Sequence, residues 1–255
     1  MSELERVIYR YFYEDSNASV LYEIDEIEIN KMIRSMKKYE RPDILSIYDN
    51  KIIGIEHFEF DSYKNDRKGS DFQRKHSVID NKMKEAMKKD LKTKDTVILH
   101  DKIESTSSLQ NYYKNFIKVF NLHYEKIDEY NEHILEDFDC ENKIIDFWFF
   151  VEDVTPLGNY YFDDKRNICL LNPLFSKGIR DLLLKSPKIK GIILGQQTMD
   201  GKKVTIIIND KNTMDKFEKY NDEVTDKDYF SFEPHTTGFA TLIPKEELEG
   251  VDNNV

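Results

Sequence analysis

The 255-residue sequence is short of cysteine, glycine and long apolar runs, and each shortage weighs against a class of protein. The two cysteines, Cys140 and Cys169, lie in no Cys-x-x-Cys pair, which disfavours the common zinc motifs and favours a reducing compartment such as the cytoplasm. Nine glycines, with no glycine-rich phosphate-binding pattern, disfavour a Walker nucleotide site and a dinucleotide-binding loop. No apolar run approaches the ~18 residues that span a bilayer, so we expect no membrane partner.

The charge balance is acidic, with a net charge of −11, and it bears on the partners that the chain can bind. Non-specific binding of long nucleic acid depends on clustered Lys and Arg, so the overall charge disfavours it and suits a protein partner. Residues 64–94 are the exception, because basic residues dominate there. This stretch is the candidate for a phosphate-facing patch, although lysine runs also occur on solvated helix faces.

The composition, with 39% hydrophobic and 13% aromatic residues, predicts a packed globular protein, and we expect residues 1–255 to form a single domain. Helical spacing of apolar residues alternates along the chain with short β-branched and aromatic runs bounded by turns. The predicted fold is therefore α/β, with a central mixed sheet that contains β-hairpins and is flanked by helices. The expected helices cover 23–38, 72–92, 108–135 and 174–186, the expected single strands 97–101, 143–156 and 167–173, and the expected hairpins 44–60 and 191–210.

One predicted strand carries an unusual group of polar residues. The stretch YERPDILSIYDNKIIGIEHFEFD contains Glu56, His57 and Glu59 close together, and burying an unpaired carboxylate costs several kcal/mol. Asp43 opens the preceding strand, and antiparallel pairing can bring its carboxylate next to that of Glu56. Carboxylate oxygens are the ligands that Mg²⁺ and Mn²⁺ prefer, so the pattern predicts a site for one of these metals.

The order of these features resembles the PD-(D/E)XK nuclease superfamily. The matching residues are Pro42-Asp43 at the start of one strand and Glu56-His57-Phe58 on the next. The resemblance covers residues 23–92, and residues 93–255 form the uncharacterised remainder of the same domain. It implies metal-dependent hydrolysis of phosphodiester bonds in nucleic acid, with Asp43 and Glu56 as ligands of Mg²⁺ or Mn²⁺.

The sequence departs from the family pattern at Phe58, which occupies the position of the motif lysine. In one interpretation, Lys75 on the following helix takes over the catalytic role of that lysine, with Arg74 or His76 as the next candidates. In a second, the strand presents its other face, because alternation places His57 and Glu59 opposite Glu56. In a third, the fold is retained and catalysis is lost. We favour the first alignment and keep His57 and Glu59 as supporting catalytic residues.

Further carboxylates are second candidates for the same site. The resemblance implies that Glu28 or Glu23, in the preceding helix, could assist. Glu152 and Asp153 follow a run of apolar residues at the end of another predicted strand, where they can reach a metal. Carboxylates at strand ends more often accept hydrogen bonds from turn backbone, which is the structural alternative.

The site itself also has a structural interpretation. An antiparallel strand with one solvated face would expose His57 and Glu59 to water and leave Glu56 as an edge-strand charge. The alternative function is then a non-catalytic, acidic protein-binding module that retains the nuclease-like fold.

Overall fold

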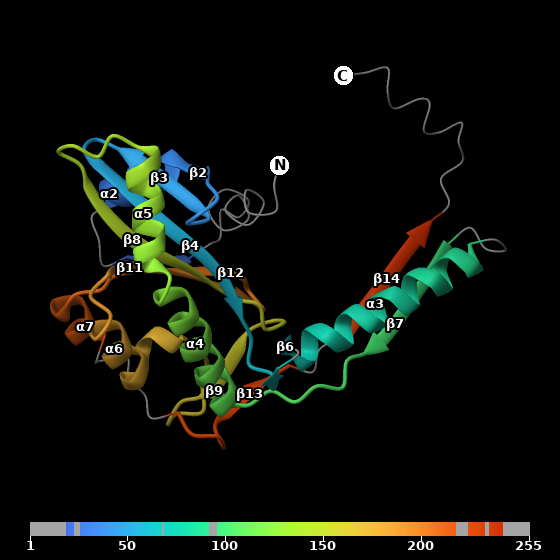
Figure 1. Cartoon of the computed structure of the whole chain (residues 1–255). Coiled ribbons are helices and arrows are strands. Elements are labelled where there is room, and N and C mark those ends of the chain that lie inside the picture. The colour runs from blue at the N-terminus through green and yellow to red at the C-terminus, as the bar shows by residue number, and fades with distance from the viewer. Residues whose placement is uncertain are drawn as a thin grey trace. The chain divides into compact units, whose positions relative to one another are not determined.

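The structure, a computed structural model, describes residues 19–22, 26–67, 69–91, 96–217, 224–232 and 235–241 (Figure 1). Contacts divide the chain into two compact units. The larger comprises residues 1–62 and 107–232, and the smaller comprises residues 63–106 and 233–255. The sequence predicts one domain over the whole chain, and within it the structure shows these two units.

Helices and strands alternate along the larger unit. Its helices are α2 (Glu26–Ser35), α4 (Leu109–Tyr124), α5 (Ile127–Asp137), the 3-10 helix η1 (Pro173–Phe175), α6 (Lys177–Leu184) and α7 (Lys211–Phe217). Its strands are β1 (Ser19–Tyr22), β2 (Met36–Lys38), β3 (Ile44–Tyr48), β4 (Lys51–Phe60), β8 (Ile144–Asp153), β9 (Asn159–Phe162), β10 (Ile168–Leu170), β11 (Ile189–Thr198), β12 (Gly201–Ile208) and β13 (Tyr229–Ser231).

A seven-stranded mixed sheet forms the centre of the larger unit, in the order β1-β12-β11-β8-β4-β3-β2. Its middle strands β4, β8 and β11 run parallel to one another, whereas β2, β3 and β4 are joined by antiparallel pairs. A smaller sheet has the order β10-β9-β13. The predicted α/β fold with a mixed central sheet, hairpins and flanking helices is therefore confirmed.

One face of the central sheet is covered by α2. Side chains alternate along each strand, so the two faces have separate cores. On this face Ile29 and Met32 of α2 pack with Ile55 of β4 and with Trp148 and Phe150 of β8. The interior of this face is therefore built mainly from aliphatic side chains around Trp148 and Phe150.

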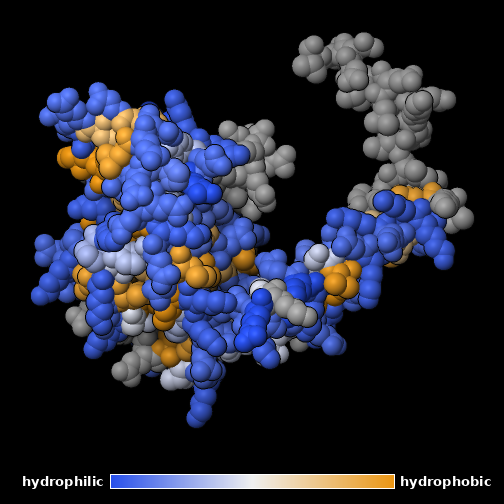
Figure 2. All heavy atoms as spheres, viewed as in Figure 1, coloured by the Kyte–Doolittle hydropathy of each residue, from blue (hydrophilic) through white to orange (hydrophobic). Residues whose placement is uncertain are grey.

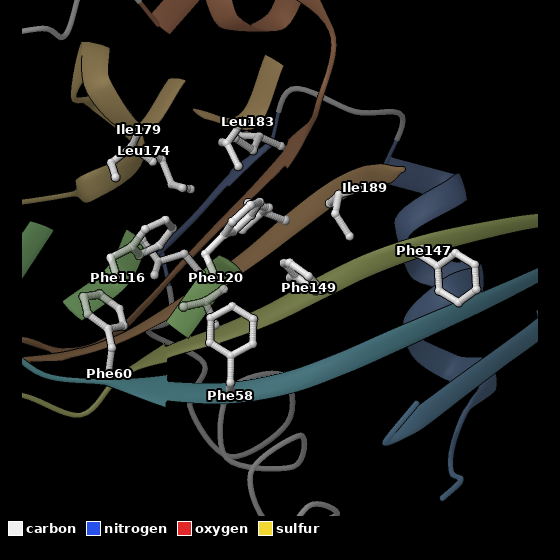
Figure 3. Packing of buried hydrophobic residues seen from close by; sticks show 14 of the residues in the cluster. Phe58, Phe60, Phe116, Phe120, Phe147, Phe149, Leu174, Ile179, Leu183 and Ile189 are labelled. Carbon is white, nitrogen blue, oxygen red and sulfur yellow. The ribbon is translucent and has the colours of Figure 1, made fainter. Parts of the chain in front are cut away.

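The opposite face is covered by α4, α5, α6 and α7 and has a larger aromatic core (Figure 3). Phe149 of β8 is fully buried there and meets the rings of Phe58 and Phe120 edge to face, with ring centroids 5.1 Å apart in both pairs. Edge-to-face aromatic pairs add about 0.5–1.5 kcal/mol each to the free energy gained from burial. The parallel strands β4 and β8 are thus packed on both sides.

Two helix boundaries differ from those expected. The helix predicted over 23–38 ends at Ser35, because residues Met36–Lys38 pair with β3 and sheet hydrogen bonding replaces the helical pattern. The helix predicted over 108–135 is two helices, α4 and α5, with a turn at residues 125–126. Among the described helices, none combines the length and the apolar character needed to cross a bilayer.

The smaller unit contains one long helix and a strand pair. These elements are α3 (Asp71–Asp90), β5 (Asn65–Asp66), β6 (Gly69–Ser70), β7 (Thr96–Lys102) and β14 (His235–Thr241). Ser70 caps the helix by accepting a hydrogen bond from the backbone N–H of Gln73, and α3 packs against the antiparallel pair of β7 and β14. Its buried side chains are Phe72 and Met83, and the partly buried Ile79 packs on the same side of the helix as Phe72.

The close approach of β11 to Trp148 gives a test of the packing on the α2 face. A Cβ atom added at Gly191 would lie 2.4–2.6 Å from atoms of the Trp148 indole ring, which is too close for any carbon contact. Gly191→Ala should therefore lower the free energy of unfolding by about 1–3 kcal/mol in urea titrations, as overpacking does. In Gly178→Ala of α6 the new Cβ would meet Ser176 Oγ at 3.9 Å, so equal behaviour of the two variants would contradict this packing.

Candidate functional site

The polar residues of β4 lie on both faces of the central sheet. Glu56 shares the aromatic face with Phe58, whereas His57 and Glu59 point to the α2 face. Strand alternation places His57 and Glu59 opposite Glu56 in the sequence analysis, and the structure has the same arrangement, with two polar groups on opposite faces of one strand.

The first group joins the two metal ligands expected from the sequence. In the β3–β4 pair, Ile44 lies opposite Ile55, so Asp43 and Glu56 come next to each other at the end of the pair. Glu56 is only 7% exposed, yet its Oε1 lies 2.7 Å from Nδ1 of His123 and accepts a hydrogen bond of 2.6 Å from the hydroxyl of Tyr130. Helices α4 and α5 therefore supply protein partners for the buried carboxylate.

Asp43 is tied to the strand rather than to a cationic side chain. Its Oδ2 accepts a hydrogen bond of 2.9 Å from the backbone N–H of His57. Burial and the neighbouring Glu56 carboxylate raise the pKa of Asp43 above its ordinary value. Burial also acts to raise the pKa of Glu56, but the hydrogen bonds from His123 and Tyr130 outweigh it and hold that pKa below its ordinary value. The pKa of Asp43 is thus raised and that of Glu56 is lowered, so Asp43 is the carboxyl group of the pair that binds a proton more readily.

Phe58 is part of the packing beside this pair. Its ring stacks on the imidazole of His123, with centroids 4.7 Å apart and an interplanar angle of 14°. It is also 5% exposed and belongs to the aromatic core. The position that holds lysine in the PD-(D/E)XK motif is therefore an apolar contact with α4 in this chain.

The other residues expected near this site have different neighbours. Glu28 forms an ion pair with Lys51 and accepts a hydrogen bond from Tyr48, at the start of β4, whereas Glu56 lies in the middle of that strand. Glu23 lies outside the described residues. Lys75 belongs to the smaller unit, where its Nζ is 2.7 Å from Asp71 Oδ2 and also donates to the backbone carbonyl of Glu104. Within that unit, the ammonium group of Lys75 thus contacts the carboxylate of Asp71 and the backbone carbonyl of Glu104.

The second group lies on the α2 face, toward the carboxyl ends of parallel strands. His57 and Glu59 of β4 and Glu152 of β8 each offer one ligand atom, and these atoms lie within 4.8 Å of one another. Glu59 and Glu152 are direct neighbours in the parallel β4–β8 register. His57 Nε2 is 3.4 Å from Glu152 Oε2, and it is a buried nitrogen with no hydrogen-bond partner. An imidazole nitrogen thus faces two carboxylates without a hydrogen bond of its own.

Burial differs within this second group. The side chain of Glu152 is 5% exposed and that of His57 is 15% exposed, whereas Glu59 is exposed. The ring of His57 also packs against Phe150 at a centroid distance of 5.1 Å. Two of the groups are therefore held firmly by the sheet, and the third opens the cluster to solvent.

Glu152 and Asp153, which the sequence grouped together, take different roles. Asp153 points to the aromatic face, where its carboxylate accepts hydrogen bonds from the hydroxyl of Tyr112, the side chain of Asn159 and the backbone N–H of Thr155. It is 1% exposed, and burial raises its pKa. Asp153 is a structural group that holds the end of β8, and Glu152 is a member of the candidate metal site.

The donor set on the α2 face suits a divalent cation. One imidazole nitrogen with two carboxylates is a ligand set that Mn²⁺ or Zn²⁺ accepts readily, whereas Mg²⁺ prefers oxygen ligands alone. On the opposite face, Oε1 of Glu56 is already saturated by two donors. The α2 face is therefore the better candidate for a metal centre.

His123 and Tyr130 are site residues that the sequence interpretation missed. Both follow the apolar stripe of the helices, since Phe116, Phe120 and Ile127 lie on the same buried side. A histidine and a tyrosine at helical spacing within such a stripe signal a buried polar partner, although nothing in the spacing says that the partner is Glu56.

The fold and the cluster together define a mixed α/β protein with a candidate divalent-metal site at the ends of parallel strands. Comparison of the chain with protein-family models, with curated proteins and with solved structures finds no match.

The hydrogen bond from Tyr130 to Glu56 makes a prediction about stability and pH. Tyr130→Phe removes one donor from a buried carboxylate, which costs about 1–3 kcal/mol of unfolding free energy near neutral pH. Because the pKa of Glu56 is lowered in the fold, its contribution is present above the ordinary glutamate pKa and is lost as pH falls through the lowered value. The variant should also begin acid unfolding at a higher pH than the wild type, measured by circular dichroism.

The control for this variant is Tyr48→Phe. Tyr48 donates a longer hydrogen bond, 3.3 Å, to the half-exposed Glu28. Its loss should change stability less. An unchanged acid transition in Tyr130→Phe would show that Tyr130 does not stabilise the charged form of Glu56.

Proposed function

We propose that the protein is a divalent-metal-dependent phosphodiesterase that acts on nucleic acid, with the metal held by His57, Glu59 and Glu152. The observation that carries this proposal is the convergence of the three ligand atoms within 4.8 Å. The resemblance of Pro42-Asp43 and Glu56 to the PD-(D/E)XK motif suggests the reaction class. The metal centre of this proposal lies on the opposite face of β4 from those two acids.

The fit of a metal to this site rests on the chemistry of the donors. His57 Nε2 is buried and makes no hydrogen bond, so a cation would satisfy it. A divalent cation supplies a Lewis acid, which lowers the pKa of bound water and offsets charge that develops on a phosphate. The exposed position of Glu59 leaves one side of the site accessible to a substrate.

The surrounding strands position these ligands. His57 and Glu59 lie on the same strand, and Glu152 is fixed next to Glu59 by the β4–β8 pairing. Asp43 accepts the backbone N–H of His57, which anchors the strand at that ligand from the other face. In this proposal Asp43 and Glu56 are supporting residues and not metal ligands.

The test is a cleavage assay on single- and double-stranded DNA and RNA with Mn²⁺, Mg²⁺ or EDTA. We expect cleavage with Mn²⁺, less with Mg²⁺ and none with EDTA. Glu59→Gln should lower the Mn²⁺-dependent rate strongly, and a melting curve in EDTA confirms that the variant is folded. Equal cleavage by the wild type and Glu59→Gln would contradict the proposal.

A second candidate function follows from Phe58. Because an apolar ring replaces the motif lysine and packs on His123, the fold can persist without catalysis at the Asp43–Glu56 face. An acidic protein-binding module, with the net charge of −11, is the corresponding function. Metal binding without cleavage of any nucleic acid would favour it. The free cysteines Cys140 and Cys169 support a reducing compartment, such as the cytoplasm, for either function.

A further inference from the structure

The smaller unit contains a segment whose charge is opposite to that of the rest of the chain. Residues 63–106 contain twelve Lys and Arg and eight Asp and Glu, so this segment has a net charge of +4, whereas the whole chain has a net charge of −11. The remaining residues therefore carry a net charge of −15. A polyanion is repelled by a surface of that sign and attracted by clustered cations, so this segment is where a polyanion meets least repulsion.

Helix α3 presents part of this positive charge on its outer surface. Phe72 and Met83 face the interior of the unit, and hydrophilic residues cover most of α3 in the view of Figure 2. Lys82, Lys88 and Lys89 are exposed, and none of them forms a salt bridge within the described part of the chain. These three ammonium groups are available to an external anion.

Other cations of the same helix are already engaged. Lys84 pairs with Asp80 at 2.6 Å, and Arg74 and Lys75 both contact Asp71. The neutralised pairs thus lie between residues 71 and 84, and the unpaired lysines lie between residues 82 and 89.

The spacing of the unpaired lysines suits a linear anion. Lys82 and Lys89 are seven residues apart, which places them on nearly the same side of the helix, about 10.5 Å apart along its axis. Lys88 and Lys89 also stabilise the last turn through the helix dipole, but Lys82 lies inside the helix and gains little from it.

We propose that α3 binds the phosphate backbone of nucleic acid through Lys82, Lys88 and Lys89. This inference rests on the proposed function and names the element that recruits its substrate. Contacts of this kind recognise phosphates and not bases, so affinity should be similar for different sequences and should fall steeply with salt.

The experiment measures fluorescence anisotropy of labelled 20-mer duplex DNA and single-stranded RNA, titrated with the full-length protein in EDTA at several salt concentrations. The test variant is Lys82→Ala/Lys88→Ala/Lys89→Ala. The control is Lys143→Ala/Lys185→Ala/Lys190→Ala, which removes three exposed lysines from the larger unit. We expect the test variant to bind at least about 10-fold more weakly at low salt and to lose about 2–3 from the slope of log K against log salt.

Two further measurements separate this inference from the proposed function. The wild type should bind nucleic acid in EDTA, where no metal is present; a failure of Mn²⁺-dependent cleavage with intact lysine-dependent binding would reject the nuclease and leave this inference standing. Single Lys82→Ala should weaken binding without changing the melting temperature. Absence of wild-type binding, equal binding by both triple variants, or binding only to anionic lipid vesicles would overturn the inference.

Discussion

Replacement of Glu152 by glutamine is expected to abolish the response of the protein to Mn²⁺. A metal that binds only the folded state stabilises it by about 2.7 kcal/mol when its concentration is 100 times the dissociation constant. Glu152 is one of the three proposed ligand groups and is largely buried, so the variant should lose nearly all of this stabilisation. Mn²⁺-dependent cleavage should fall by at least about 100-fold, since several kcal/mol of transition-state stabilisation depend on the metal.

The matched control for Glu152→Gln is Asp146→Asn. Asp146 lies on the same strand and, by alternation, on the same face, and its replacement changes the charge by the same amount. The thermal response to Mn²⁺ should be unchanged in the control. If both variants keep the response, Glu152 is not a ligand; melting in EDTA confirms that each variant is folded.

Replacement of Asp153 by alanine is expected to give the largest loss of stability among the polar positions. The carboxylate accepts hydrogen bonds from Tyr112, Asn159 and Thr155 inside the protein. Its removal leaves three buried donors without their acceptor, and such groups cost about 1–3 kcal/mol each. Because the neighbours relax partly, we expect a total loss of about 3–5 kcal/mol in the free energy of unfolding, measured in urea.

Asp163→Ala provides the comparison for Asp153→Ala. Asp163 also accepts several hydrogen bonds, from the backbone N–H groups of Lys165 and Asn167 and from the side chain of Asn167. These donors are exposed and water can replace the carboxylate, so the loss should be clearly smaller. A similar loss in both variants would show that burial does not set the importance of Asp153.

The sequence predicts the fold class well because its strongest patterns are local. The hairpin of β3 and β4 and that of β11 and β12 follow from β-branched runs around turn residues, and both are present. The helix predicted over 23–38 runs past the end of α2 at Ser35, because Met36–Lys38 forms a strand that pairs with β3. The local sequence pattern does not reveal this pairing. Tertiary pairing overrides propensity at such boundaries.

The candidate site is predicted less completely, for reasons of strand geometry and distance along the chain. The sequence identifies Asp43, Glu56, His57 and Glu59, and alternation already places His57 and Glu59 opposite Glu56, but nothing local shows which face can hold a metal. Only the register of β8 against β4 shows that Glu152 joins His57 and Glu59. Neighbours that come from far along the chain cannot be read from the spacing within one strand.

The most direct test of the proposed metal centre compares the two faces of β4 in one titration. Mn²⁺ is titrated calorimetrically into the wild type, Glu59→Gln and Glu56→Gln, each shown to be folded. We predict one site in the wild type, loss of binding in Glu59→Gln, and wild-type binding in Glu56→Gln, whose carboxylate already has His123 and Tyr130 as partners. Loss of binding in Glu56→Gln with retention in Glu59→Gln would place the metal on the opposite face and contradict the account.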